Sequence, residues 1–435
     1  MAVVLGIMIL VHELGHYAAA KWFGVRVDVF SLGFGKRLTG FRRGGTDYRI
    51  SALPLGGYVK MAGENPLESR SGAPDEFMSH PRWQRFVIAI AGPAMNIFLA
   101  IALLTGVFMV RYEHPLYLEQ PAVVGWVLEN SPAAKAGVQQ GDRIVRIESE
   151  QNPTWEDVML KLMVSSKQPV DVALQRGNQI LEKSIQPETD GSDQFGSIGW
   201  LPDEPIIVTE LEPDMPATKA GLKLGDDIVA VNGVPMRSLL SVISFLQQNG
   251  GKPMDVTAIR DGRPLHFTIT PVQTEDNGRK AFRLGFHSQP VHVDKLPFAQ
   301  ALSRSLDENK KYSLLIVDLV HKMVEHKVSI KQMEGPIGIA RASGDAARQP
   351  GWTPLLSLMA MISLNLGIFN LLPIPILDGG MILMLAVESI MRRDISIRIK
   401  ERIYQTAFVF LLLFFAVVIY NDLMKALPGL AQRLP

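Results

Sequence analysis

Ala2 to Ala20 reads AVVLGIMILVHELGHYAAA, an apolar run broken only by the ionisable residues of HELGH at positions 12–16. About 20 apolar residues suffice to cross a bilayer as a helix, and the run approaches that length only when HELGH is included. Ionisable side chains inside a membrane segment are costly and usually functional. The stretch therefore predicts a membrane helix that carries a functional site.

The spacing within HELGH indicates a metal site. His12 and His16 are four residues apart, so they lie on one face of a helix, close enough to bind the same metal ion. Glu13 would then lie beside that ion as a general base, which is the arrangement of zinc metalloproteases. The alternative is an interfacial helix on which these residues are incidental.

The composition narrows the classes of partner and site. The chain has 435 residues, of which 47% are hydrophobic, with a formal net charge of +1 and no cysteine. This length allows two to four domains, and the near-zero charge argues against nucleic acid as a partner. Without cysteine there is neither a disulfide framework nor a thiolate site, so a metal must be held by His, Asp, Glu, Asn or backbone oxygen.

Three further segments have the composition of membrane spans. Phe86 to Val110 carries no charge and is flanked by arginines, and Thr406 to Tyr420 is dense in Phe, Leu and Val. Leu355 to Ile390 is longer and is interrupted by Asn, Pro, Asp and Gly residues. Together with the first run, these segments predict four spans.

The loops between the spans predict the orientation of the chain. Two of them are rich in Lys and Arg, and such loops face the cytoplasm. Four spans then place both termini and the large central region on the opposite side of the membrane, with the metal in the membrane nearer the cytoplasmic face. The basic residues are Arg26, Lys36, Arg37, Arg42, Arg43, Arg49, Lys60, Arg70 and Arg82 in the first loop and Arg392, Arg393, Arg398, Lys400 and Arg402 in the second.

Residues 122–290 contain an internal duplication. SPAAKAGV at 131–138 and GDRIV at 141–145 return as MPATKAGL at 215–222 and GDDIV at 225–229. Each copy reads as a strand, a short helix ending in glycine, a Gly-Asp turn, a strand and a second helix, at Trp155–Met163 and Leu239–Gln248. Asp261-Gly262 predicts a hairpin between two later strands. The pattern resembles PDZ domains of bacterial envelope proteases.

Two functions of these repeats stay open. PDZ domains capture extended peptides by adding a strand to a sheet edge. Alternatively, the repeats are a spacer or steric gate that binds no terminus. The second copy has Asn232-Gly233 where the first has Glu148-Ser149, so the two grooves are not expected to be equivalent. After the repeats, Leu296 to Met333 is amphipathic and predicts a membrane-surface or linker helix.

Asn370 to Gly380 reads NLLPIPILDGG and breaks the third span. Two prolines and two glycines unwind a helix at membrane depth, which is tolerated only where the backbone lines a polar cavity or is buried in protein. Asp378 in this break needs a partner, and a zinc ion that requires a third protein ligand is a sufficient one. The alternatives are a helix-capping aspartate or a counter-ion to a basic side chain.

These motifs carry a resemblance to a known family. HExxH in the first span, Asn-x-x-Pro-x-Pro-x-Leu-Asp-Gly in a later span and tandem PDZ-like repeats between them resemble the site-2 protease family of intramembrane metalloproteases, in its regulator-of-sigma-E branch. Further matching segments are GFG at 33–35, GGYVKM at 56–61 and GPAMN at 92–96. The resemblance covers nearly the whole chain, and the short leader before the first motif leaves open whether the natural N-terminus is longer.

The resemblance implies roles for the residues of the two catalytic motifs. His12, His16 and Asp378 would bind Zn²⁺, and Glu13 would be the general base. Asn370 would bind substrate or stabilise the oxyanion of the tetrahedral intermediate.

It also implies where the substrate binds. The loop around Ser31 to Met61 would form a membrane-associated β-hairpin that pairs with an extended substrate strand, with Gly57, Tyr58 and Val59 as substrate-binding residues. Asn365 is a further candidate for contacting the substrate backbone.

The expected fold is a multi-pass α-helical membrane protein with four transmembrane helices, two inserted α/β (mainly β) PDZ domains and a membrane-associated β-hairpin. Its expected segments are the first helix with HExxH (1–23), the cytoplasmic hairpin loop (24–84), the second helix (85–111), the two PDZ domains (120–203 and 204–290), amphipathic linker helices (296–348), the broken third segment (354–391) and the fourth helix (403–422).

The expected activity is that of an intramembrane zinc metalloprotease in the bacterial inner membrane. Its partners would be single-pass membrane proteins, either a pre-trimmed anti-sigma factor in envelope-stress signalling or signal-peptide remnants, together with membrane lipid and no nucleic acid. The expected oligomeric state is a monomer. Two other classes stay open: a catalytically silent PDZ membrane scaffold, which would tolerate loss of Glu13, and a metal transporter, which would not need the repeats.

Overall fold

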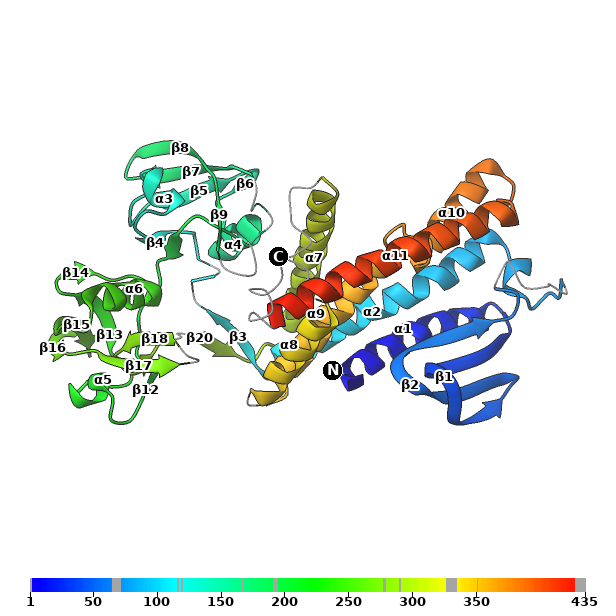
Figure 1. Cartoon of the computed structure of the whole chain (residues 1–435), viewed down its shortest axis with the longest axis horizontal. Coiled ribbons are helices and arrows are strands. Elements are labelled where there is room, and N and C mark those ends of the chain that lie inside the picture. Colours follow the sequence, from blue (N-terminus) through cyan, green and yellow to red (C-terminus); the bar gives the residue numbers. More distant parts are fainter. Residues whose placement is uncertain are drawn as a thin grey trace. The chain divides into compact units, whose positions relative to one another are not determined.

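The chain divides into two compact units. The computed structural model describes residues 2–64, 72–115, 117–118, 120–163, 165, 168–190, 195–276, 279–288, 291–325, 335–349 and 351–426. The first unit, mainly helical apart from one β-hairpin, comprises residues 1–111, 295–317 and 333–435, and the second, rich in strands, comprises residues 112–294 and 318–332. The elements of both units are labelled in Figure 1.

Four described helices are long and apolar enough to cross a membrane. They are α1 (Ala2–Trp22), α2 (Arg82–Val110), α9 (Thr353–Asn370) and α11 (Ile397–Ala426). The break predicted in the third span is confirmed, because α9 ends at Asn370 and a separate helix, α10 (Asp378–Met391), follows the two prolines. Asp378 thus begins a new helix directly after the predicted break.

Glycines let α1, α2 and α9 approach closely. A Cβ atom on Gly15 would lie 2.3 Å from the carbonyl oxygen of Ala91, and one on Gly367 would lie 3.0 Å from that of Pro93. In lipid, where helix association depends on packing, small residues at the contact serve this purpose. Val4 and Met8 of α1 are buried in one cluster with Met359 and Ile362 of α9. The helix that carries HELGH is therefore fixed between two neighbours.

The predicted β-hairpin is present and is folded on itself. It consists of β1 (Val27–Arg43) and β2 (Thr46–Met61), which are long and bent. The first half of β1 pairs on one side with the end of β2 (Leu32 with Gly57) and on the other with its start (Leu32 with Ile50), while the second half of β1 also pairs with the start of β2 (Phe41 with Tyr48). The end of β2, residues 57–61, is consequently an outer edge of a four-segment sheet.

The two repeats of the second unit have matching sheets, in the orders β6-β5-β7-β8 and β14-β13-β15-β16. The predicted helices at 155–163 and 239–248 are found as α4 (Trp155–Met163) and α6 (Leu239–Asn249), and the predicted hairpin turn at Asp261-Gly262 joins β15 to β16. The strands are β5 (Arg143–Ile147), β6 (Glu150–Gln151), β7 (Val170–Arg176), β8 (Gln179–Ile185), β13 (Asp227–Val231), β14 (Val234–Pro235), β15 (Met254–Arg260) and β16 (Arg263–Ile269).

Each repeat encloses its own apolar core and has the same ion pair, between a buried aspartate and a partly exposed arginine. Asp142 is 1% exposed and accepts two hydrogen bonds from Arg176, and Asp226 is 0% exposed and accepts two from Arg260. At the turn where the two copies differ in sequence, Glu148 takes the same left-handed conformation (φ 52°) as Asn232 (φ 49°), and the expected difference between the two grooves stays a prediction.

Short elements complete the second unit. The helices α3 (Pro132–Lys135) and α5 (Pro216–Lys219) occupy equivalent places in the two repeats. The paired strands are β3 (Tyr112–Pro115) with β20 (Val291–Asp294), β4 (Val124–Val127) with β11 (Trp200–Pro202), β9 (Glu188–Asp190) with β10 (Phe195–Ser197), β12 (Glu210–Leu211) with β19 (Phe286–His287), and β17 (Val272–Asp276) with β18 (Arg279–Arg283).

The predicted amphipathic segment forms two helices, α7 (Phe298–Val324) and α8 (Pro336–Arg348), with residues 326–334 outside the described part of the chain. The first part of α7 packs on the helical unit, where Tyr312 and Ile316 contact the cluster around Ala100. Ser305 donates a hydrogen bond of 2.9 Å to the carbonyl oxygen of Ile101. The helix α7 therefore packs beside α2, although much of the surface of α7 is polar. A one-turn 3₁₀ helix, Phe77–Ser79, precedes α2.

Candidate active site

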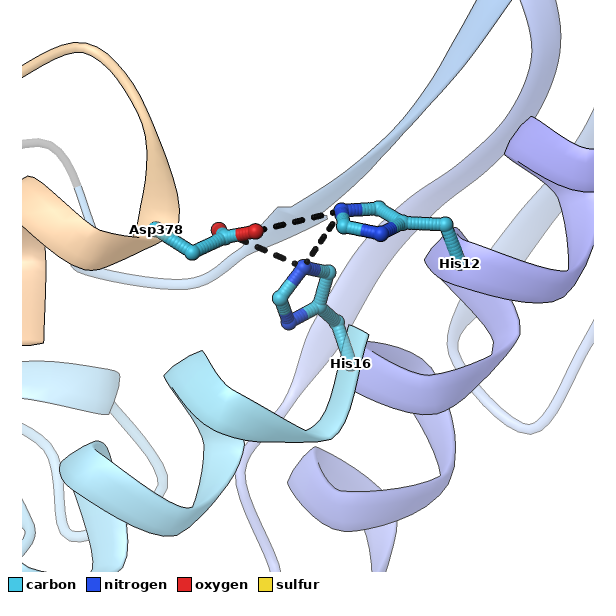
Figure 2. Close-up of side chains that lie close together, drawn as sticks. All are labelled: His12, His16 and Asp378. Atoms are coloured by element: carbon cyan, nitrogen blue, oxygen red, sulfur yellow. Dashed lines mark hydrogen bonds and ion pairs between the residues drawn. The ribbon is translucent and has the colours of Figure 1, made fainter. Parts of the chain in front are cut away.

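The side chains of His12, His16 and Asp378 converge at the point where α1 meets the start of α10 (Figure 2). His12 is 7% exposed and His16 is 8% exposed. The Nε2 atoms of the two imidazoles are 3.2 Å apart, and the Asp378 carboxylate spans them, with Oδ2 3.2 Å from His12 Nε2 and Oδ1 3.4 Å from His16 Nε2. The three residues thus come together from segments more than 360 positions apart in the chain.

The spacing of these atoms fits a zinc ion. A tetrahedral ion with bonds of about 2.0–2.1 Å to nitrogen and oxygen separates its ligand atoms by about 3.3 Å. The measured separations of 3.2–3.4 Å match that value. Three protein ligands with two imidazoles and one carboxylate also have the composition of a catalytic zinc site, in which the fourth position is left for water or substrate.

The outer nitrogen of each imidazole is also engaged. His16 Nδ1 lies 2.8 Å from the carbonyl oxygen of Ile88, to which it can only donate, so Nε2 is the nitrogen free to accept or bind. His12 Nδ1 lies 3.2 Å from the side-chain amide of Asn96. Such contacts fix ring orientation at metal sites. Both rings are held by α2 with Nε2 directed into the cluster.

Gly92 makes room for His16. A Cβ atom at this position of α2 would lie 2.2 Å from His16 Nε2, well inside contact distance. The next residue, Pro93, lacks a backbone N–H to bond back along the helix. The GPAMN segment, which the sequence marked only through a resemblance, is therefore the wall against which the histidines pack.

Glu13 is bound by the edge of the hairpin. The backbone N–H of Val59 in β2 donates to Glu13 Oε2 at 3.0 Å. A Cβ atom on Gly57 would lie 3.5 Å from Glu13 Cγ, so the strand passes directly beside the carboxylate. The edge of the sheet and the candidate general base are thus in contact.

A cavity of about 450 Å³ opens on the cluster. Of the predicted site residues, Asn370, Tyr58 and Val59 line it together with Glu13 and the three candidate ligands. Asn365 and Gly57 are not among the described lining residues, and their roles stay predictions. The remaining lining is mostly apolar: Ile9, Phe34, Met61, Ile88, Ala89, Leu366, Ile376, Leu377 and Met381, with Glu64 as a further polar residue.

The glycines after Asp378 explain its position. A Cβ atom on Gly379 would lie 2.2 Å from the carbonyl oxygen of Leu372, and one on Gly380 would lie 2.2 Å from that of Ile374. The broken segment folds back onto the first turn of α10 at this point, which side chains would prevent. Because Asp378 is the first residue of that helix, the close turn delivers its carboxylate to α1.

The sequence profile of peptidase family M50 matches residues 1–414. The chain belongs to peptidase family M50. Among its relatives, the regulator of sigma-E protease RseP of Escherichia coli is 34% identical, over 97% of this chain and 96% of that protein. The regulator of sigma E protease of Salmonella typhi is 33% identical over the same shares. A protein of Vibrio cholerae whose name describes a zinc metalloprotease is 31% identical, again over 97% and 96%.

The M50 assignment and the names of these relatives imply zinc for this chain. They support a zinc metalloprotease, and the four described helices that are apolar enough to cross a membrane suggest that it is a membrane protein. The fit of the three candidate ligands agrees with zinc. Among solved structures, the PDZ domain of an SdrC-like protein of Listeria monocytogenes aligns with 20% of this chain and 90% of that domain, at 18% identity and a TM-score of 0.18. At that TM-score, the PDZ assignment of the repeats remains a prediction.

Two polar residues of this M50 site were not singled out from the sequence. Asn96 touches His12, but an asparagine in an apolar helix is as typical of helix packing as of a site. Glu64 follows β2, where it accepts a hydrogen bond of 3.2 Å from the backbone N–H of Met61. Burial raises the pKa of Glu64 to about 7, against the opposite effect of the Met61 N–H. Only the folded hairpin brings Glu64 to the cavity.

Proposed function

We propose that this M50 chain is an intramembrane zinc endopeptidase. The observation that carries the proposal is the cluster of His12, His16 and Asp378, built on helices apolar enough to cross a membrane, with Glu13 beside it. A metal transporter would also place such ligands in spans, but it needs neither an adjacent glutamate on a cavity wall nor a strand edge at the site.

His12, His16 and Asp378 would hold the zinc ion. When bound, zinc supplies a Lewis acid that polarises a carbonyl group and makes water a nucleophile near neutral pH. Glu13 takes the proton from the attacking water and delivers it to the leaving amine. The Asn370 amide, on the cavity wall, donates to the developing oxyanion, a contribution of about 3 kcal/mol in typical sites.

The edge of β2 is the proposed docking strand for the substrate. Residues 57–61 form an outer edge of the hairpin sheet, and the N–H of Val59 points away from the sheet toward Glu13. A peptide strand added at such an edge gains main-chain hydrogen bonds. A helical substrate hides its carbonyl groups, so it must unwind into a strand before it is cut. Pairing with β2 would stabilise that extended form beside the cluster.

The proposed substrates are the transmembrane segments of single-pass membrane proteins. Two relatives bear the name regulator of sigma-E protease. This name supports a pre-trimmed anti-sigma factor as one substrate. The basic loops support an orientation in the inner membrane with the repeats and both termini in the periplasm. There the two repeats, as PDZ domains, would exclude substrates that still carry a bulky outer domain.

Metal removal in proteoliposomes tests the function. The purified chain should contain one zinc ion and cut a model single-span substrate within its membrane segment. A chelator should stop cleavage, and zinc should restore it. Cleavage that persists without metal would contradict the proposal, and zinc binding without cleavage of any single-span protein would favour a silent scaffold. Comparison of an anti-sigma segment with a signal-peptide remnant would show which class is preferred.

A further inference from the structure

Asn96 lies at the middle of α2 and is completely buried, with an exposed fraction of 0%. Its side-chain Nδ2 is 3.2 Å from Nδ1 of His12, and among the described residues its Oδ1 has no hydrogen-bond partner. Its backbone carbonyl accepts a hydrogen bond of 2.9 Å from Ser363 of α9. A buried amide with an unused acceptor thus faces a candidate metal ligand.

The proton on His12 decides whether this imidazole can bind a metal. A neutral imidazole has one N–H, and the nitrogen without it is the one that can bind. With Asn96 Nδ2 donating to Nδ1, the proton of His12 lies on Nε2, the nitrogen that faces Asp378 and His16. A half-turn of the amide exchanges its oxygen and nitrogen. Oδ1 then accepts from Nδ1–H, and Nε2 is free.

We propose that Asn96 is a positioning residue for the zinc site, which accepts a hydrogen bond from His12 Nδ1–H and thereby selects the tautomer whose Nε2 binds the metal. This inference rests on the proposed zinc site. His16 receives the same support from the backbone carbonyl of Ile88, which no substitution can remove. Among the described residues, Nδ1 of His12 is held by a side chain, whereas Nδ1 of His16 is held by a backbone carbonyl.

The chemistry of an amide suits this position. Partners that orient metal-bound histidines are usually carboxylates, backbone carbonyls or water. A carboxylate here would add a buried negative charge close to Glu13 and Asp378, at a high desolvation cost while no metal offsets it. The neutral amide avoids that cost. It can also donate to Nδ1 before metal binds and accept from Nδ1–H afterwards.

Zinc affinity, measured by competition with a chromophoric chelator, tests the proposal. All variants carry Glu13→Gln, so that the readout is independent of turnover. Asn96→Leu, which has a similar size and no acceptor, should bind zinc about 10- to 100-fold more weakly. Asn96→Asp, whose ionised carboxylate can only accept, should bind within a few-fold of the parent. Ser363→Ala is the matched control, because it removes the contact to the Asn96 carbonyl but leaves the His12 contact, and it should bind as the parent does.

The outcomes separate this proposal from the proposed function. If the parent binds no zinc, the zinc site itself is wrong. If the parent binds one zinc ion and Asn96→Leu binds it equally well, the positioning role is overturned. If Asn96→Leu does not fold, Asn96→Asp decides the question. A zinc affinity of Asn96→Asp about 10- to 100-fold weaker than that of the parent, as expected for a lost partner, would overturn the proposal. A purely structural role predicts altered thermal stability with zinc affinity unchanged in both variants.

Discussion

At the scale of single residues, the spacing of the motif predicted the candidate metal ligands, and the structure showed which neighbouring residues hold them in place. His12, Glu13 and His16 could be identified because helical geometry alone puts them on one face. Asp378 could be predicted because a carboxylate in a broken membrane helix needs a partner. Asn96 and Gly92 could not, since their roles depend on how closely α2 approaches α1, and local sequence carries no signal for that distance.

Gly92 offers a direct test of this close approach. A Cβ atom there would lie 2.2 Å from His16 Nε2, so Gly92→Ala should displace the imidazole and lower zinc affinity and cleavage by at least tenfold. The matched control is Gly106→Ala in the same helix, where a Cβ atom meets nothing within 4 Å. That variant should keep both properties and gain a little helix stability, of about 1 kcal/mol at most. Equal zinc affinity of the two variants would show that zinc binding does not depend on the close packing of Gly92 against the His16 imidazole.

At the scale of elements, the resemblance of the sequence implied a hairpin but not the arrangement of its strands. The pairing of β1 with two parts of β2 is a long-range event that no local pattern encodes. For the same reason, the sequence predicted α7 only as a membrane-surface or linker helix. Its apolar residues Tyr312 and Ile316, which pack beside α2, lie among charged residues in the sequence.

The edge of β2 is where the hairpin should matter for catalysis. Val59→Pro removes the N–H that binds Glu13, and proline is tolerated at a sheet edge where no ladder bond is lost. We expect turnover of a single-span substrate to fall by at least tenfold while zinc content stays at the wild-type level. A variant that cleaves normally would show that neither the bond to Glu13 nor strand pairing at this edge contributes. Loss of zinc would instead point to a disturbed cluster.

At the scale of the whole molecule, the duplication could be predicted because both copies keep the same turn residues and apolar positions. The structure adds that both copies also keep an ion pair between a buried aspartate and a partly exposed arginine. Burial by itself would raise the pKa of Asp226, but the Arg260 guanidinium and the Lys223 N–H outweigh it, so the pKa lies below its ordinary value. A lowered pKa means that the ionised carboxylate stabilises the fold.

The second repeat should therefore lose stability in acid. The contribution of Asp226 is complete above the ordinary aspartate pKa of about 3.9 and disappears as the pH falls through the lower value of the folded state. Hydrogen exchange of β13 and β15 in the full chain checks this. At neutral pH, Asp226→Asn should exchange faster than wild type, and the difference should shrink in acid. A difference that does not change with pH would contradict the assignment.

Removal of the repeats tests their proposed gating role. β3, which precedes the repeats, pairs with β20, which follows them, and Pro115 lies opposite Val291. A short turn between these adjacent strands can therefore replace the two repeats. The shortened protein should cut both a trimmed substrate and one that retains a bulky periplasmic domain, whereas the full chain should cut only the trimmed one. An unchanged substrate range would argue against gating and leave peptide capture as the role of the repeats.

The central claim is that Glu13 acts as a base at a zinc site formed by three residues. Its most direct test is Glu13→Gln in proteoliposomes, with zinc content, substrate binding and cleavage measured on the same preparation. The account predicts one zinc ion and substrate bound as in wild type, with cleavage reduced by at least about 100-fold, as expected for loss of general base catalysis. Turnover near the wild-type rate with zinc bound would contradict it.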